Sequence, residues 1–247
     1  MGFTPFVDDL GFITALILAA AAVFTYTSVR AFLGILRNDA KGVRAILKAS
    51  SVPVGMIGTS GLALGLFTQF TWPFLLSDGL GAYDIFFGDV LMLFSMVLIV
   101  YAIVAYLGLR LEYAGLFGLV GGVITAWYGY WGYTTLVAPG VLGLTKDPLE
   151  TFLMYLAFAA AGFFAFPATL AVDWYLEHPG TKWTPFSFSI RPAAAPTEAA
   201  SDSPGAWHVP LSFYAVTVWF PIFVFLAFVA AWFYMGAILP GHLTSPP

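Results

Sequence analysis

Residues 85–108 read IFFGDVLMLFSMVLIVYAIVAYLG, a run in which Asp89 is the single charged side chain. A helix needs about 20 mostly apolar residues to cross the hydrocarbon core of a bilayer. Because such a run is continuous rather than alternating, it predicts a helix and not a strand of a membrane barrel. Five further stretches share this character, and the six predicted spans are Gly11–Leu36, Val52–Phe74, Ile85–Gly108, Leu116–Leu136, Leu149–Leu176 and Ser212–Leu239.

Composition supports the same conclusion for the whole chain. Of its 247 residues, 60% are hydrophobic and 9% are charged, whereas soluble domains carry about 25% charged residues. A soluble protein this apolar would have no surface suited to water, so we expect the lipid bilayer to surround it. The sequence therefore predicts an all-α transmembrane bundle of about six spanning helices, with residues 1–247 forming a single transmembrane domain.

The basic residues predict how the chain is oriented. With six spans, Lys146 falls on one side of the membrane and all other Lys and Arg residues fall on the opposite side. Positively charged loops stay in the cytoplasm, so we expect a multi-pass protein of the cell membrane with both termini outside. The eight residues assigned to the cytoplasmic side are Arg30, Arg37, Lys41, Arg44, Lys48, Arg110, Lys182 and Arg191.

One connection is long enough to extend into the aqueous phase. Residues 177–211 are expected to form a cytoplasmic loop, and the part 191–205 reads RPAAAPTEAASDSPG. A composition rich in Ala, Pro and Ser is typical of disordered segments. We therefore predict a disordered linker at 191–205.

Small residues recur at helical spacing in two of the predicted spans. Gly61 and Gly65 form one small-xxx-small pair, and Gly118 and Gly122 form another. Small residues allow helix backbones to approach closely in a membrane, where the hydrophobic effect does not drive association. These glycines are predicted to pack helices together. The alternative is that they line a pore or make room for a flat ligand.

Aromatic residues mark one face of the fourth predicted span. Trp127, Tyr130 and Trp131 share a helix face. Such a face is suited to stacking on a quinone, a haem or a carotenoid, which makes these three residues the candidates for cofactor binding. It is equally typical of an aromatic girdle at the membrane interface. Which cofactor, if any, is bound stays unknown at this point.

Four polar residues in the predicted spans are candidates for function, because such residues are costly in a bilayer. Asp89 opens the third span, where an acid also suits the helix dipole. Gln69 is expected to hydrogen bond between helices. Glu150 follows Pro148 in a regular helix start, and Asp173 lies near the inner end of the fifth span.

Two of these acids have candidate partners. Asp89 shares a helix face with Met92 and Met96, and a carboxylate with thioethers is one pattern of a copper path. Without histidine this pattern does not define a metal site, and none is predicted. Asp173 has a depth in the membrane that would allow pairing with Arg30 or Arg110.

The rest of the sequence excludes several classes of chemistry. There is no Cys, so thiol catalysis and disulfides are ruled out. The three His residues lie outside the predicted spans, where they cannot form a bis-His haem site within the bundle. No phosphate-binding loop, nucleophile elbow or HExxH motif is present, so no catalytic residue is assigned. No basic patch of the kind that binds nucleic acid is found.

Two short motifs suggest a relationship to known proteins. The residues Phe87-Gly88-Asp89 open one predicted helix, and residues 143–150, GLTKDPLE, open another. The stretch from Asp84 to Asp173 that contains them resembles a family of multi-pass membrane proteins of unknown function that is best represented in archaea. The resemblance implies membrane topology and no established activity.

Two functions are compatible with these observations. The first is a non-catalytic subunit of a larger membrane complex of respiratory or redox type, with other membrane subunits or a second copy of the chain as partners. Short loops, small-residue interfaces and abundant aromatic surface favour it. The alternative is a small transporter or channel whose path is lined by the acidic candidates. Transporters usually place polar sites at the midplane, and the predicted spans have few charges there.

Overall fold

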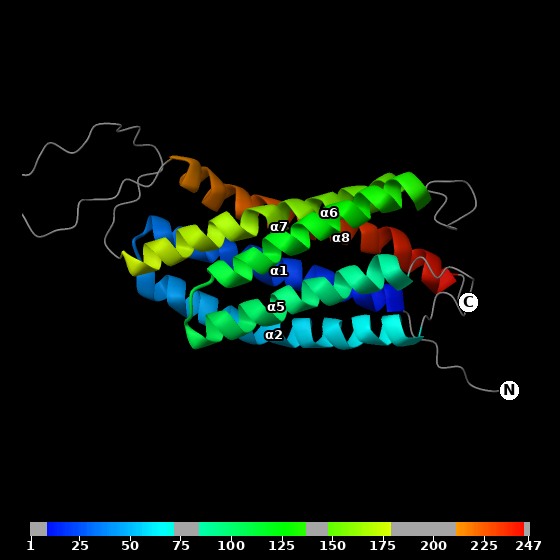
Figure 1. Ribbon diagram of the computed structural model, residues 1–247, viewed down its shortest axis with the longest axis horizontal. Helices are drawn as coiled ribbons and strands as arrows, with labels where there is room; N and C mark the ends of the chain where they lie inside the picture. The colour runs from blue at the N-terminus through cyan, green and yellow to red at the C-terminus, as the bar shows by residue number, and fades with distance from the viewer. Residues whose placement is uncertain (1–8, 72–83, 137–147, 179–210, 245–247) are drawn as a thin grey trace, which may run out of the picture.

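The computed structural model describes residues 9–71, 84–136, 148–178 and 211–244. This part of the chain is entirely helical (Figure 1), which confirms the predicted fold class. The predicted loop 177–211 and its linker 191–205 lie almost wholly outside the described residues. The helices are α1 (Asp9–Leu36), α2 (Ala40–Thr71), α5 (Val90–Leu107), α6 (Glu112–Leu136), α7 (Pro148–Glu177) and α8 (Leu211–Thr244), with a π-helix, η1 (Asp84–Asp89), leading into α5.

Five of the six long helices have the length and apolar character needed to cross a membrane: α1, α2, α5 together with η1, α7 and α8. The sixth, α6, has 25 residues, which is long enough to span a bilayer. Its glycines, tyrosines and tryptophans give it a less apolar composition. It packs between α5 and α7, which are both long and apolar enough to cross a membrane. The chain is therefore a multi-pass membrane protein.

The six helices form a closed ring. Each helix packs against the next along the chain, from α1 to α2, α5, α6, α7 and α8, and α8 returns to pack against α1. Figure 1 shows the helices running side by side along the long axis of the molecule. As a result, each helix has two neighbours, one face toward the ring interior and one face outward.

Two tight turns close the ring at one end. Asn38 (φ 56°) follows α1 and Gly108 (φ 69°) follows α5, and both have the left-handed conformation that commonly ends a helix. Beyond each, an amide bonds back to the carbonyl five residues earlier: Asp39 N to Gly34 O and Leu109 N to Val104 O. Glycine and asparagine tolerate this conformation better than other residues.

All described basic residues lie toward this end of the bundle, on the left in Figure 1, which we call the basic end. The opposite end is called the far end. The positive-inside rule predicts that the basic end faces the cytoplasm, and that orientation stays a prediction. The residues are Arg30, Arg37, Lys41, Arg44, Lys48 and Arg110.

Helix α2 begins well before the span predicted from hydropathy at Val52. Asp39 caps it, because its Oδ1 accepts a hydrogen bond from Gly42 N at 2.8 Å, as N-cap residues do. The first turns carry the exposed side chains of Lys41, Arg44 and Lys48. The hydropathy pattern therefore identified the apolar part of α2 and missed its polar extension.

Two clusters of buried residues fill most of the ring interior. The far-end cluster consists of Ile13, Phe86, Phe87, Leu91, Met154, Tyr155 and Tyr234. The basic-side cluster consists of Ala20, Ala31, Ile35, Val43, Leu47, Val54, Leu98, Tyr101, Ala105, Leu111, Ala114, Ala171 and Tyr175. The outward surface is also apolar: Phe70 is 82% exposed and Phe233 is 72% exposed. A surface of this kind suits contact with lipid.

Candidate functional site

Inside the helix ring lies a chamber of about 180 Å³ that is lined by side chains from all six long helices. On α1 the lining runs from Ala21 to Ile35, and on α7 it runs from Phe158 to Val172. Each interval covers fourteen residue steps, or about 21 Å of helix. The chamber is therefore elongated along the helix axes.

Aromatic rings form much of the chamber wall. Phe24 of α1 and Tyr101 of α5 lie with ring centroids 4.9 Å apart. Phe94 of α5 and Phe158 of α7 make an edge-on contact at 5.8 Å. All four rings line the chamber, and tilted or edge-on pairs are the arrangements that aromatic side chains favour. The walls are therefore apolar and well packed.

Glycines of α6 form the opposite wall and also allow α7 to approach. A Cβ added at Gly118 would lie 2.8 Å from the Cβ of Ala165, and one added at Gly122 would lie 2.8 Å from the carbonyl oxygen of Ala159. Both glycines also line the chamber. The two roles considered for them, packing and lining a ligand space, thus fall on the same residues.

The other glycine pair lies away from the chamber, between α2 and α5. Gly61 faces Ser95 of α5, and a Cβ at Gly65 would lie 3.3 Å from the carbonyl oxygen of Gly88. Neither glycine lines the chamber. Their contacts are those of close helix packing.

Among the described residues, the chamber lining contains hydroxyl groups but no charged side chain. Three of these hydroxyls are satisfied within the protein. Ser28 donates to Thr25 O at 3.1 Å, Thr169 donates to Phe166 O at 2.8 Å, and Tyr101 lies 2.9 Å from Ser50 Oγ. The remaining two belong to Thr27 of α1 and Thr125 of α6.

The far end is closed by the far-end cluster, which is built around the π-helix η1. The Tyr155 hydroxyl of α7 donates to the Phe86 carbonyl at 2.8 Å, and the two rings stack with centroids 4.5 Å apart. π-helical turns alter the regular hydrogen-bond ladder. Here a side chain from another helix supplies the partner of a backbone carbonyl inside an apolar cluster.

Asp89 and Gln69 lie beside this closure and not in the chamber. Asp89 Oδ2 accepts a hydrogen bond from the Tyr128 hydroxyl of α6 at 2.6 Å. Gln69 lies against Gly88, where an added Cβ would be 2.8 Å from its Nε2. The Asp89–Tyr128 bond links α5 to α6 at the far end.

Asp173 lies at the basic end, next to the lining residue Val172. Its side chain is 4% exposed, and its Oδ2 accepts a hydrogen bond from Glu112 N at 2.8 Å. Asp173 of α7 therefore caps the first turn of α6, where a carboxylate also suits the helix dipole. Its bond goes to the α6 backbone and not to Arg30 or Arg110, the partners considered from sequence.

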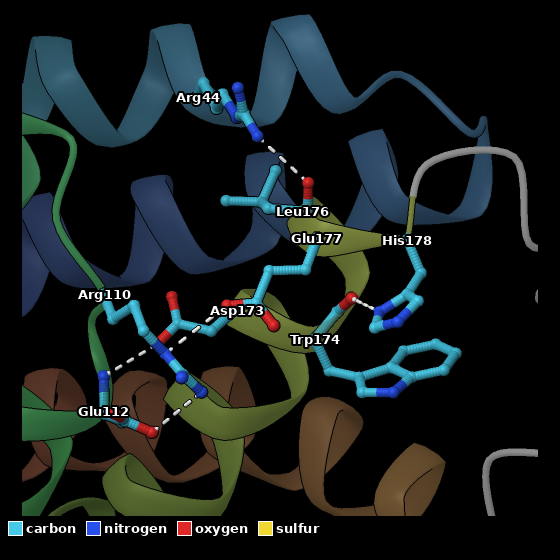
Figure 2. A network of polar contacts seen from close by, with 8 residues as sticks. All are labelled: Arg44, Arg110, Glu112, Asp173, Trp174, Leu176, Glu177 and His178. Atoms are coloured by element: carbon cyan, nitrogen blue, oxygen red, sulfur yellow. Dashed lines mark hydrogen bonds and ion pairs between the residues drawn. The ribbon is translucent and has the colours of Figure 1, made fainter. Parts of the chain in front are cut away.

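Further polar contacts close the basic end around this cap (Figure 2). Arg110 pairs with Glu112 at 3.0 Å and with Glu177 at 3.4 Å. Arg44 of α2 donates to the Leu176 carbonyl of α7 at 2.9 Å across the ring. These contacts hold α2, α6 and α7 together and compensate the charge of Arg110.

The remaining sequence candidates lie outside the chamber. Trp127 is 67% exposed and Tyr130 is 58% exposed, so both face outward, whereas Trp131 packs against the far-end cluster. Glu150 is in the first turn of α7, and its side chain lies outside the described residues. Within the described part of the chain, no three His, Asp or Glu residues are grouped as metal ligands.

Sequence reasoning did not identify the chamber or the residues that matter most to it. Thr27 and Thr125 are hydroxyl residues inside apolar spans, which is a weak signal because most such residues bond to their own helix. Tyr155 and Tyr128 gain significance only from partners on other helices. Their roles depend on which helices are neighbours, and hydropathy does not specify this.

Comparison with known proteins assigns the family. Residues 1–178 match a family described as "Protein of unknown function (DUF981)", and the chain belongs to this family because the match covers well over half of it. This agrees with the resemblance to a membrane family of unknown function. Neither the curated proteins nor the solved structures include a match to the chain.

Proposed function

We propose that this member of a family of unknown function binds the hydrocarbon chain of a long-chain membrane molecule in its central chamber. The observation that carries the proposal is the chamber itself: it has a volume of about 180 Å³, lies among six helices, and has no charged residue among the described side chains that line it. Ligand sites in helix bundles are commonly built between facing helices in this way.

The lining chemistry supports an apolar occupant over water or ions. A buried water needs two to four polar partners, and the chamber wall consists almost entirely of hydrocarbon and aromatic groups. An ion would need compensating charge or carbonyl ligands. A bound hydrocarbon chain would instead contact the walls along their length, replacing the contacts that an empty chamber lacks.

Photolabelling tests this proposal directly. The protein would be placed in nanodiscs with an alkane that carries a mid-chain diazirine, irradiated, and labelled residues located by peptide mass spectrometry. We expect labels on chamber residues such as Phe94 and Phe158. Ala21→Phe should fill part of the chamber and reduce this labelling, because Ala21 is 3% exposed and lines it.

Ala22→Phe is the matched control, since Ala22 has the same residue type on the same helix and is exposed on the outward face of α1. It should leave chamber labelling unchanged. Labels confined to outward-facing residues in the wild type, with no response to Ala21→Phe, would refute chamber binding.

A transport function makes a different prediction. It requires the acidic candidates to line a common path, yet Asp89 bonds to Tyr128 at the far end and Asp173 caps α6 at the basic end. Neither lines the chamber. Loss of ion flux in Asp89→Asn protein reconstituted in liposomes would support transport, whereas chamber binding predicts no such loss.

The subunit hypothesis rests on the outward aromatic surface, which includes Trp219 (46% exposed) and Trp232 (61% exposed) on α8. Trp is suited both to partner contacts and to lipid. This hypothesis is compatible with chamber binding, because a subunit can hold a lipid-soluble molecule for a partner. Purification in mild detergent with a stoichiometric membrane partner would support it.

A further inference from the structure

The two remaining hydroxyls of the chamber differ from most other threonines of the described helices. Thr25 and Thr68, for example, donate to the carbonyl four residues earlier, at 2.7 Å and 3.0 Å. This is the usual arrangement for threonine in a helix. Thr59, Thr71 and Thr134 do the same. Among the described threonines, the side chains of Thr27, Thr125 and Thr151 make no hydrogen bond, and of these three only Thr27 and Thr125 line the chamber.

Thr27 is the more significant of the two. It is 3% exposed and lines the chamber, so its side chain is shielded from the outer surface of the bundle and lies at the chamber wall. A buried polar group without a partner is costly, and most such groups in proteins are satisfied. A hydroxyl in this situation indicates that a partner comes from outside the chain.

We infer that the chamber binds an uncharged long-chain molecule whose hydroxyl or carbonyl oxygen hydrogen bonds to Thr27. The inference rests on the proposed function and adds the chemical class of the ligand. Thr27 lies near the middle of the lining of α1, which runs from Ala21 to Ile35. The ligand oxygen is therefore placed near mid-chamber, with hydrocarbon extending from it along the walls.

Charge around the chamber favours an uncharged ligand. No charged side chain lines it in the part of the chain that the structure describes, and an anionic headgroup inside would be strongly disfavoured without a cation. Arg110, which precedes the lining residue Leu111, already pairs with Glu112 and Glu177. The cap carboxylate of Asp173 lies beside these residues, so the arginine at the start of α6 is already compensated and is less available to a phosphate or carboxylate.

Competition against the alkane photolabel tests the inference. Nanodisc samples would be titrated with pentadecan-8-ol, which has its hydroxyl at mid-chain, with pentadecane, and with pentadecanoate. A single uncharged hydrogen bond contributes a factor of about ten in affinity. We therefore expect the alcohol to compete about tenfold better than the alkane, and the carboxylate to compete least.

Variants of Thr27 separate this contact from general packing. Thr27→Val keeps the shape and removes the hydroxyl, so the advantage of the alcohol should disappear while the alkane competes as before. Thr27→Ser should retain the advantage. Thr25→Val is the matched control, because Thr25 bonds to its own helix at Ala21 O and does not line the chamber.

The outcomes distinguish the two proposals. Equal competition by alcohol and alkane in the wild type, an unchanged alcohol advantage in Thr27→Val, or strong competition by pentadecanoate would each overturn the inference and leave chamber binding intact. If no competitor displaces the label and Ala21→Phe does not reduce it, chamber binding itself fails. Thermal unfolding of each variant in the same nanodiscs would verify that it is folded.

Discussion

The contact between α6 and α7 allows a quantitative prediction from two neighbouring glycines. A Cβ at Gly122 would lie 2.8 Å from the carbonyl oxygen of Ala159 and 3.0 Å from the amide nitrogen of Phe163. Both are backbone atoms of α7, so they cannot rotate away as a flexible side chain would. A Cβ at Gly121 would instead lie 3.5 Å from a methyl group of Val97, which is an ordinary contact.

The variants Gly122→Ala and Gly121→Ala therefore share one effect and differ in another. Both gain the same helix propensity, about 1 kcal/mol in aqueous hosts. Gly122→Ala must also push α7 away by a few tenths of an ångström, and overpacking of this kind costs about 1–3 kcal/mol. We expect Gly122→Ala to be less stable than Gly121→Ala by about 1–3 kcal/mol.

Unfolding by sodium dodecyl sulfate in mixed micelles, followed by circular dichroism or tryptophan fluorescence, would measure this difference. Using the neighbouring glycine as reference removes the propensity term and most effects on the unfolded state. Equal stability of the two variants would show that α6 and α7 are not packed backbone to backbone at this position. The glycine wall of the chamber would then need a different explanation.

Two further predictions concern the ends of the chamber. Tyr155→Phe removes the donor to the Phe86 carbonyl and should destabilise the protein by about 1–3 kcal/mol, because that carbonyl is left unpaired in an apolar cluster; Tyr130→Phe, on an exposed side chain, should change stability by less than about 0.5 kcal/mol. Asp173→Ala removes the cap of α6 and should lower the free energy of unfolding by about 1–2 kcal/mol. Glu177→Gln changes an exposed ion pair and should lower it by about 0–1 kcal/mol. The same detergent titration measures all four, and equal effects within either pair would contradict the corresponding role.

The predicted spans and the observed helices agree where local composition decides the structure. The apolar run at 85–108 and its five counterparts are visible without knowledge of any neighbour, because a bilayer selects helices by length and hydropathy alone. Hydropathy does not predict the extension of α2 before Val52. This part of the helix begins at a cap formed by Asp39, and its first turns carry basic residues that lie outside the apolar segment.

The candidate site was less predictable because it depends on the order of helices around the ring. The contact of α8 with α1 closes that ring, and nothing in either segment alone indicates the pairing. The sequence makes Asp89 and Asp173 functional candidates, because a charged side chain in a membrane span is costly. The structure places them in interhelical bonds, and places the less conspicuous Thr27 at the chamber wall.

The chamber also predicts how stability should depend on bound hydrocarbon. Unfilled space inside a protein deprives the surrounding side chains of contacts, so the folded protein should be less stable when the chamber has no hydrocarbon in it. Extraction into a short-chain detergent that strips bound lipid should therefore lower stability. Adding pentadecane should restore part of it, since a ligand that binds only the folded state stabilises that state.

Ala21→Phe and Ala22→Phe separate this effect from a general response of the detergent micelle. A phenylalanine at position 21 occupies chamber space, so the variant should respond little to pentadecane, whereas the outward-facing variant at position 22 should respond as the wild type does. A micelle effect would act on all three proteins alike. Stability that is unaffected by pentadecane in the wild type would mean that the chamber walls close when it is empty, and a site that collapses in this way would not retain a hydrocarbon chain.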